Sequence, residues 1–376
     1  MPSTDLHPFR CELDDSAVDD LRQRLARTRW PDQLPGTTWE LGTDSTYLQA
    51  LCGYWADAFD LAAFEQRCNR YPQIRTEVDG TTVHAITAAS RALDATPLLL
   101  IHGWPGSVAE HFDVIEPLRA DHHVVVASLP GYGFSGPTTP AGIGPPEIAG
   151  ILVELMHRLG HDRFFVAGGD WGAIVGGWLA ARHPESVLGA HLTMLTIPAP
   201  ADDVRAQVTD RELGLHQRAR QTMATGTGYQ AIQSTRPQSL AYALTDSPAG
   251  LAGWIVEKFH AWSDCGGDIG SVFTMDRLLD NVSIYWFTAT INSSMRLYHE
   301  AMGVPRRTAP DRVVTVPTGH AVYPGEIYHT PRAWAEARFH IVHWTEMPRG
   351  GHFAAMEVPD VYAADLLAFT RGVAAR

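Results

Sequence analysis

The sequence has 376 residues, of which 45% are hydrophobic, and a formal net charge of −13. This length and apolar content predict either one large domain with an insertion or two domains. The acidic balance, without any cluster of Lys and Arg, excludes the usual pattern of a nucleic-acid binder and favours a small-molecule substrate.

The four cysteines form no Cys-x-x-Cys pair, so we expect reduced thiols in a cytoplasmic protein rather than a disulfide scaffold. The first fifteen residues are polar and acidic, unlike a signal peptide. No run of about 18 apolar residues occurs, so we expect no membrane span. We expect no cofactor and no metal, and the sequence leaves a homodimer open.

Residues 1–90 are interpreted as an N-terminal extension. Apolar residues recur at helical spacing over 18–25, after the capping pattern Ser16-x-x-Asp19, and residues 45–69 favour further helix. Residues 74–86 then contain Asp79-Gly80 at their centre, which is typical of a type I′ turn. We therefore predict a β-hairpin there.

Strands and helices alternate after this extension. Short apolar runs at 97–101, 123–128 and 164–167 predict strands buried on both faces, and 187–197 predicts another. Helices are expected at 148–159 and 173–182. This βαβ pattern predicts a parallel sheet, and we assign residues 91–198 to the first part of an α/β core.

Residues 199–305 interrupt the alternation, because they are helix-like and rich in aromatic residues. We predict that they form a helical cap. The alternation then resumes over 306–376, with strands at 312–316 and 340–344 and helices at 331–339 and from 359 onward. The expected architecture is a mostly parallel sheet flanked by helices, with a cap and an N-terminal extension.

The five residues 168–172 read Gly-Gly-Asp-Trp-Gly between a predicted strand and a predicted helix. This is the context of the nucleophile elbow of the α/β-hydrolase fold, here with Asp170 in the place of serine. A carboxylate is nucleophilic at neutral pH and attacks an electrophilic sp³ carbon to give an ester. The other interpretation is that Asp170 merely caps a helix between two turn glycines.

A second motif, His-Gly-Trp-Pro-Gly at 102–106, directly follows the strand at 97–101. In α/β-hydrolases this loop contributes one backbone N–H to the oxyanion hole, and the residue after the nucleophile contributes the other. We therefore expect the N–H groups of Trp104 and Trp171 to stabilise the tetrahedral oxyanion. A plain turn of Gly and Pro is the alternative.

Hydrolysis of an ester on Asp170 needs a general base, and His352 is the candidate because it follows the last strand, as the order nucleophile, acid, histidine requires. His340 and His343 are weaker candidates. Glu326 is the first carboxylate after the strand at 312–316 and is the expected acid. It could instead lie at the start of the next helix, and Glu346 is a weaker alternative.

These motifs resemble those of epoxide hydrolases of the microsomal type, over nearly the whole chain. The matching segments are 29–31, 102–107, 168–172, 234–237, 285–288 and 293–298. The resemblance implies an enzyme that opens a small-molecule epoxide, with an N-terminal domain wrapped around the core. It also implies two cap tyrosines, Tyr229 and Tyr298, that protonate the epoxide oxygen; Tyr285 is the rival for the second place. The N-terminal anchor of membrane-bound members is missing, so we expect a soluble protein.

Three other functions are alternatives. A haloalkane dehalogenase also uses an aspartate nucleophile, and Trp104 and Trp171 could hold a halide, but it needs neither the two tyrosines nor the extension. A carboxylesterase needs serine at position 170. A non-catalytic binding protein would not need the nucleophile, acid, base and oxyanion loop together. The sequence leaves the physiological epoxide open, including bulky epoxides of natural-product pathways.

Overall fold

A nine-stranded sheet organises the computed structural model, which describes residues 5–92, 94–198, 200–205, 207–303 and 307–375. The strands are β1 (His7–Phe9), β2 (Gln73–Val78), β3 (Thr81–Ala88), β4 (Thr96–Ile101), β5 (His122–Ser128), β6 (Phe164–Gly168), β7 (Val187–Leu192), β8 (Val314–Val322) and β9 (Phe339–Glu346). Their order is β1-β2-β3-β5-β4-β6-β7-β8-β9. The pairs from β5 to β9 are parallel, and β1, β2 and β3 add antiparallel strands at one edge. This confirms the predicted α/β-hydrolase architecture.

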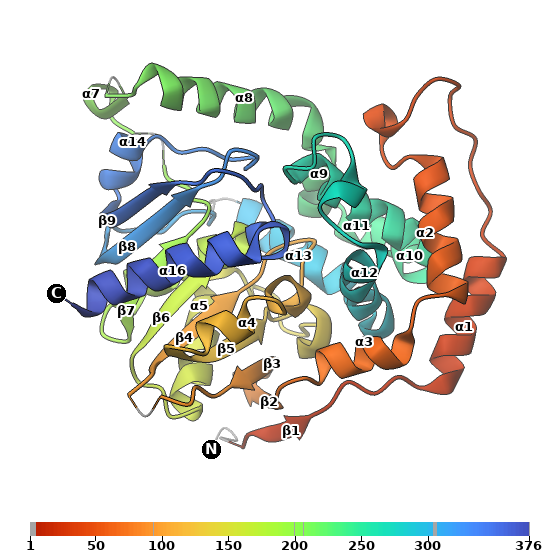
Figure 1. Ribbon diagram of the computed structural model, residues 1–376, viewed down its shortest axis with the longest axis horizontal. Coiled ribbons are helices and arrows are strands. Elements are labelled where there is room, and N and C mark those ends of the chain that lie inside the picture. The colour runs from red at the N-terminus through yellow and green to blue at the C-terminus, as the bar shows by residue number, and fades with distance from the viewer. Residues whose placement is uncertain (1–4, 93, 199, 206, 304–306, 376) are drawn as a thin grey trace.

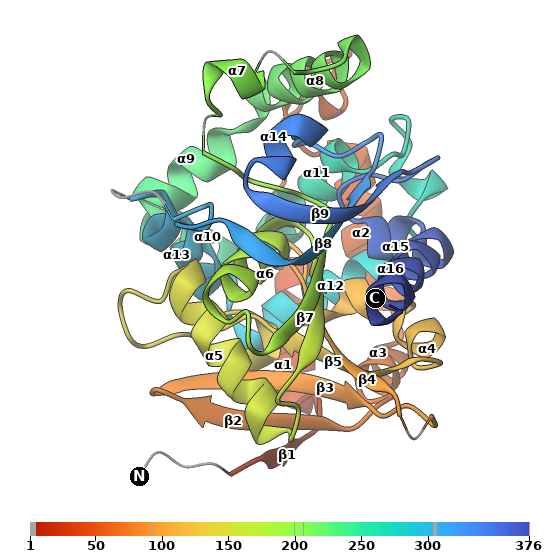
Figure 2. The ribbon, with the colours of Figure 1, turned by 90° about the vertical axis from the view of Figure 1, so that its left-hand side faces the viewer.

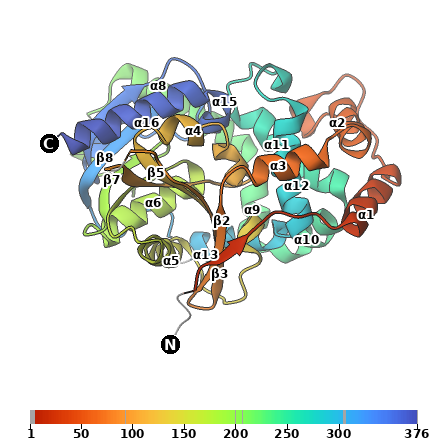
Figure 3. The same cartoon turned by 60° about the horizontal axis from the view of Figure 1, so that its bottom comes forward.

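Helices cover both faces of this sheet. Figure 3 shows α4 (Ile115–Leu118) and α16 (Pro359–Ala374) on one face, and α5 (Pro145–Arg158) and α6 (Asp170–Arg182) on the other. The central strand β6 and the last four residues of β4 are apolar and buried, because helices exclude water from both faces of the sheet there. Because the central strands are parallel, their carboxyl ends lie at the same edge of the sheet, where ligand-binding sites form in such folds.

Residues 200–205 and 207–303 contain helices and no strand in the part that the structure describes. The helices are α7 (Asp202–Arg205), α8 (Asp210–Gly226), α9 (Gly228–Thr235), α10 (Pro237–Asp246), α11 (Pro248–Trp262), η4 (Ile269–Ser271), α12 (Met275–Thr288) and α13 (Ile291–Met302). The expected cap boundaries at residues 199, 305 and 306 lie outside the described residues. Figure 2 shows α7 and α8 beyond α14 (Arg332–Glu336). His216 Nδ1 of α8 is hydrogen-bonded to the carbonyl of His329, in the loop before α14.

The N-terminal extension contacts both the sheet and the cap. The predicted hairpin is confirmed as β2 and β3, with φ values of 47° at Asp79 and 73° at Gly80. Helices α1 (Asp15–Ala26), α2 (Ser45–Asp57) and α3 (Leu61–Cys68) lie beside cap helices α11 and α12 (Figure 1). Arg67 of α3 pairs with the buried Asp280 of α12 through two hydrogen bonds of 2.6 and 2.7 Å. The extension therefore packs against the cap as well as the core.

Four local predictions were wrong in detail. The first helix begins at Asp15, before the predicted cap Ser16. Its cap is therefore Asp14, whose side chain accepts a hydrogen bond from the Ser16 N–H. β7 ends at Leu192 rather than at 197. β8 runs on to Val322 where a loop was expected after 316, since Pro317 is accommodated at a register shift. α14 is shorter than predicted, because β9 already begins at Phe339.

The remaining short helices are η1 (Trp39–Leu41), η2 (Val108–His111), η3 (Gly133–Ser135) and α15 (Ala354–Glu357). Within the described ranges, none of the helices has the length and apolar character needed to cross a bilayer.

Candidate active site

The turn between β6 and α6 carries Asp170. Its φ of 48° is in the left-handed region, which non-glycine residues rarely adopt. A Cβ atom at Gly168 or Gly172 would lie only 2.7 or 2.0 Å from the Ile101 carbonyl oxygen, so both positions require glycine. The tight turn raises the Asp170 carboxylate above the carboxyl edge of the sheet, as a nucleophile elbow does.

The loop after β4 lies directly against this carboxylate. The backbone N–H of Trp104 donates to Asp170 Oδ1 at 2.9 Å. A Cβ atom at Gly103 would lie 2.4 Å from that of Asp170, which explains why the loop needs glycine there. Trp171 follows Asp170 as the next residue of α6, with its ring buried. Both expected oxyanion-hole residues thus flank the carboxylate.

Cap helix α12 supports the same loop. The Tyr285 hydroxyl donates to the Gly106 carbonyl at 2.7 Å, and Asn281 Nδ2 donates to the Pro105 carbonyl at 2.8 Å. The Tyr285 hydroxyl therefore already donates its proton to a backbone carbonyl. This geometry favours Tyr298 over Tyr285 as the second tyrosine that faces Asp170.

His352, in the loop after β9, lies between two carboxylates. Its Nδ1 is 2.7 Å from Glu326 Oε1, and its Nε2 is 3.5 Å from Asp170 Oδ2. Burial would lower the pKa of His352, but the charges of Glu326 and Asp170 outweigh burial and hold that pKa well above its usual value. The His352 imidazole therefore lies between the Glu326 and Asp170 carboxylates, the arrangement expected of an acid, a base and a nucleophile.

The rival candidates lie elsewhere. Glu346 forms an ion pair of 2.6 Å with Arg211 and is half exposed. His343 Nε2 is 2.8 Å from Asp365 Oδ1, and His340 is exposed. None of these three side chains takes the place of Glu326 or His352.

Tyr229 on α9 and Tyr298 on α13 are buried above the carboxylate. The Tyr229 ring stacks on Trp104 with centroids 5.3 Å apart, and the Tyr298 ring meets Trp171 edge-on at 4.8 Å. The two tyrosine rings are 5.7 Å apart. Burial raises the pKa of both phenols well above the ordinary value, and the charge of Asp170 adds to this. Both hydroxyls therefore remain protonated at neutral pH.

A cavity of about 750 Å³ connects these groups. Asp170, Trp171, Tyr229 and Tyr298 all line it. The Tyr298 hydroxyl is buried without a hydrogen-bond partner of normal geometry among the described residues. A buried donor of this kind needs a partner, and an electrophile with an acceptor oxygen would supply one.

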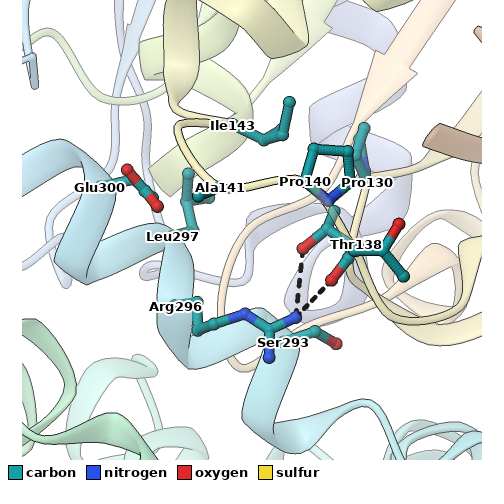
Figure 4. Close-up of a pocket in the computed structure, with 10 residues that line it drawn as sticks. Pro130, Thr138, Pro140, Ala141, Ile143, Ser293, Arg296, Leu297 and Glu300 are labelled. Atoms are coloured by element: carbon teal, nitrogen blue, oxygen red, sulfur yellow. Dashed lines mark hydrogen bonds between the residues drawn. The ribbon is translucent and has the colours of Figure 1, made fainter. Parts of the chain in front are cut away.

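Helix α13 is fixed to the core on its opposite side, next to a smaller cavity of about 290 Å³ (Figure 4). Arg296 donates from Nη2 to the Thr138 carbonyl at 2.6 Å, as Figure 4 shows, and the Gly142 N–H donates to Glu300 Oε1 at 3.0 Å. Because Tyr298 belongs to the same helix, these contacts hold its hydroxyl above Asp170.

Sequence reasoning missed two carboxyl groups next to the site. Glu357 accepts the backbone N–H groups of Gly351 and Phe353, each at 2.9 Å, and so orders the loop on both sides of His352. Burial raises the pKa of Glu357 to about 7. Loss of water around Glu110, which lies against the loop at 102–106, raises its pKa to about 8. The only sequence signal for either residue was an acidic group within an apolar stretch.

Comparison with known proteins agrees with this geometry. Residues 6–111 match the family model "Epoxide hydrolase N terminus", and residues 96–235 match that of the alpha/beta hydrolase fold. A Stigmatella aurantiaca protein is 40% identical over 96% of this chain and 83% of its own length. Epoxide hydrolase 1 of Sus scrofa is 34% identical over 97% of this chain and 88% of that protein.

The chain belongs to the epoxide hydrolase family. The crystal structure of juvenile hormone epoxide hydrolase from the silkworm Bombyx mori superposes with a TM-score of 0.92 at 30% identity, covering 99% of this chain and 95% of that one. This epoxide hydrolase therefore shares the architecture of its family over its full described length. The dehalogenase, carboxylesterase and non-catalytic alternatives are set aside.

Proposed function

We propose that this epoxide hydrolase forms a covalent ester on Asp170. The carboxylate oxygen bonds to an epoxide carbon, the bond between that carbon and the ring oxygen breaks, and the ring oxygen takes a proton from Tyr229 or Tyr298. The observation that carries the proposal is the placement of the carboxylate and both phenols on one cavity. An alkoxide forming in a buried site needs such a donor.

His352 acts in the second step. Esterification removes the negative charge of Asp170, so the pKa of His352 falls and the neutral imidazole becomes available as a base. His352 then takes a proton from water, which attacks the ester carbonyl, while Glu326 stabilises the imidazolium. The N–H groups of Trp104 and Trp171 receive the oxyanion. When the oxyanion collapses, His352 returns its proton to the leaving diol oxygen, and the second proton of the attacking water restores the tyrosine phenol. A vicinal diol is released, and the Asp170 carboxylate is regenerated.

Labelled water tests the covalent step. In a single turnover in H₂¹⁸O, with enzyme in excess over a simple aryl epoxide, we expect the label to enter the Asp170 carboxylate, because water attacks the ester carbonyl rather than the epoxide. Mass spectrometry of the peptide that contains Asp170 measures the label. Label in the diol with none in the protein after the first turnover would show direct attack by water and contradict the proposal.

Glu326→Gln tests the role of the acid. We expect hydrolysis of the ester to slow by roughly 100-fold or more, while ester formation changes less, because Glu326 orients and stabilises only the imidazolium. Rapid-mixing kinetics separate the two steps. Glu346→Gln, which changes a surface carboxylate on the same part of the sheet, is the matched control. Equal effects of the two substitutions would remove Glu326 from the mechanism.

Several broader expectations remain part of the proposal. We propose the domain boundaries 1–90, 91–198, 199–305 and 306–376, a cytoplasmic location and a homodimer. The four cysteines, all buried and free, support a reducing compartment. Size-exclusion chromatography with light scattering tests the homodimer.

A further inference from the structure

The active-site cavity is much longer than opening an epoxide requires. It begins at Asp170 and follows one face of α6, formed by Trp171, Ile174 and Trp178, as far as Arg182. With a rise of about 1.5 Å per residue, the helix advances about 18 Å between positions 170 and 182. The cavity therefore accommodates a substrate with a long extension beyond the reacting carbon.

The walls along this length are apolar and adaptable. Met194, Met223 and Met302 line the cavity together with Ile197 and Ile327. The hydroxyl of Thr196, which also lines the cavity, donates its proton to the Thr308 carbonyl and therefore does not donate to a ligand. Methionine side chains adjust to the shape of a flexible apolar ligand. These walls favour an alkyl or alkenyl chain.

The far end of the cavity is cationic, although the chain as a whole carries a net charge of −13. Arg182 and Arg338 both line it and bind consecutive residues: Arg182 pairs with Asp311 at 2.7 Å, and Arg338 donates to the Pro310 carbonyl at 3.1 Å. No carboxylate lies within ion-pair distance of Arg338 in the described ranges of the chain. One hydrogen bond holds the Arg338 guanidinium in place, and its other N–H groups can donate to an anion.

We propose, on the basis of the proposed function at Asp170, that the preferred epoxides carry a carboxylate at the end of an extended apolar chain. Arg338 binds this carboxylate while the epoxide carbon lies at Asp170. A guanidinium matches the geometry of a carboxylate with two parallel hydrogen bonds, and the apolar wall excludes water from the chain between the two ends. Binding at the distant end thereby places the epoxide at the nucleophile.

Three epoxides and two variants test this proposal. The probes are a terminal epoxide joined by a long unbranched chain to a carboxylate, its methyl ester, and a short aryl epoxide without a chain. We expect Arg338→Ala to lower kcat/KM for the acid by about 10- to 100-fold, mainly through KM, because a charge-assisted hydrogen bond is lost. The ester and the aryl epoxide should be unaffected. Arg332→Ala, which removes an exposed arginine of α14 that pairs with Glu336, is the matched control.

The outcomes distinguish this proposal from the one on which it rests. If Arg338→Ala lowers kcat/KM equally for acid and ester, or for neither, Arg338 does not bind the carboxylate, although turnover of the aryl epoxide still supports the chemistry at Asp170. If the wild-type enzyme opens none of the three epoxides, the proposed function itself fails. Turnover of the aryl epoxide also reports that each variant is folded, and Arg338→Lys should recover part of the preference for the acid.

Discussion

His352→Gln should accumulate the covalent ester on Asp170. Formation of the ester uses the Asp170 carboxylate and a tyrosine proton, whereas its hydrolysis needs the base. We therefore expect alkylation to continue and hydrolysis to fall by about 10²- to 10⁴-fold, the range of general-base catalysis. Intact-mass spectrometry should show the protein plus one substrate. Glutamine is chosen because its amide can still donate to the buried Glu326.

A substitution on the same region of the chain controls for general effects. His340 is exposed at the second residue of β9, so His340→Gln should turn over at the wild-type rate without an adduct. An unmodified His352→Gln protein with full turnover would assign the base to another histidine. An unmodified protein without turnover would mean that His352 is needed for ester formation as well, which contradicts the proposed division of the two steps.

The double variant Tyr229→Phe/Tyr298→Phe should lose ester formation by about 10²- to 10⁴-fold, as expected for the removal of a general acid. Each single substitution should cost less, about 10- to 100-fold, because the rings lie 5.7 Å apart and the remaining phenol still reaches the ring oxygen. The effects should not add, since both residues act on one atom. Burst kinetics followed by tryptophan fluorescence isolate this step, because Trp171 adjoins Tyr298.

The pH dependence of this step adds a check. Because burial raises the pKa of both phenols, the donors stay protonated and ester formation should not decline between pH 7 and about 9, near which an ordinary tyrosine begins to ionise.

Tyr242→Phe, on the exposed surface of α10, is the matched control for the tyrosine variants. A double variant that forms the ester at nearly the wild-type rate would refute the assignment, and Tyr285 would be examined next.

Much of the fold and the elbow that carries the candidate nucleophile can be predicted from the sequence, because their signals are local. The runs of apolar residues at 97–101 and 164–167 can be buried on both faces only in a covered parallel sheet. Residues 168–172 combine the small residues of a tight turn with one carboxylate, and both the constraint and the chemistry lie within five consecutive positions. Asp79-Gly80 likewise encodes a turn through its own backbone preferences.

The roles assigned to more distant residues rest on information that no local pattern contains. Chain order distinguishes His352 among the 18 histidines, but the approach of His352 to Glu326 and Asp170 depends on the order of β6, β8 and β9 in the sheet. Only the family resemblance indicates Tyr229 and Tyr298, since nothing in their neighbouring residues shows where α9 and α13 lie. For the same reason, the sequence does not indicate that Glu357 lies beside His352 or that Arg338 lines the cavity.

Apolar periodicity and turn residues in the sequence therefore define the elements, the elbow and the carboxylate at its tip, because backbone conformation and burial are set over a few neighbouring positions. The pairing of β8 beyond Pro317, the alignment of His352 with two carboxylates and the length of the cavity arise in the folded chain. Each of them depends on distances between segments that are far apart in sequence, and these distances are set by how the sheet, the cap and the extension pack together.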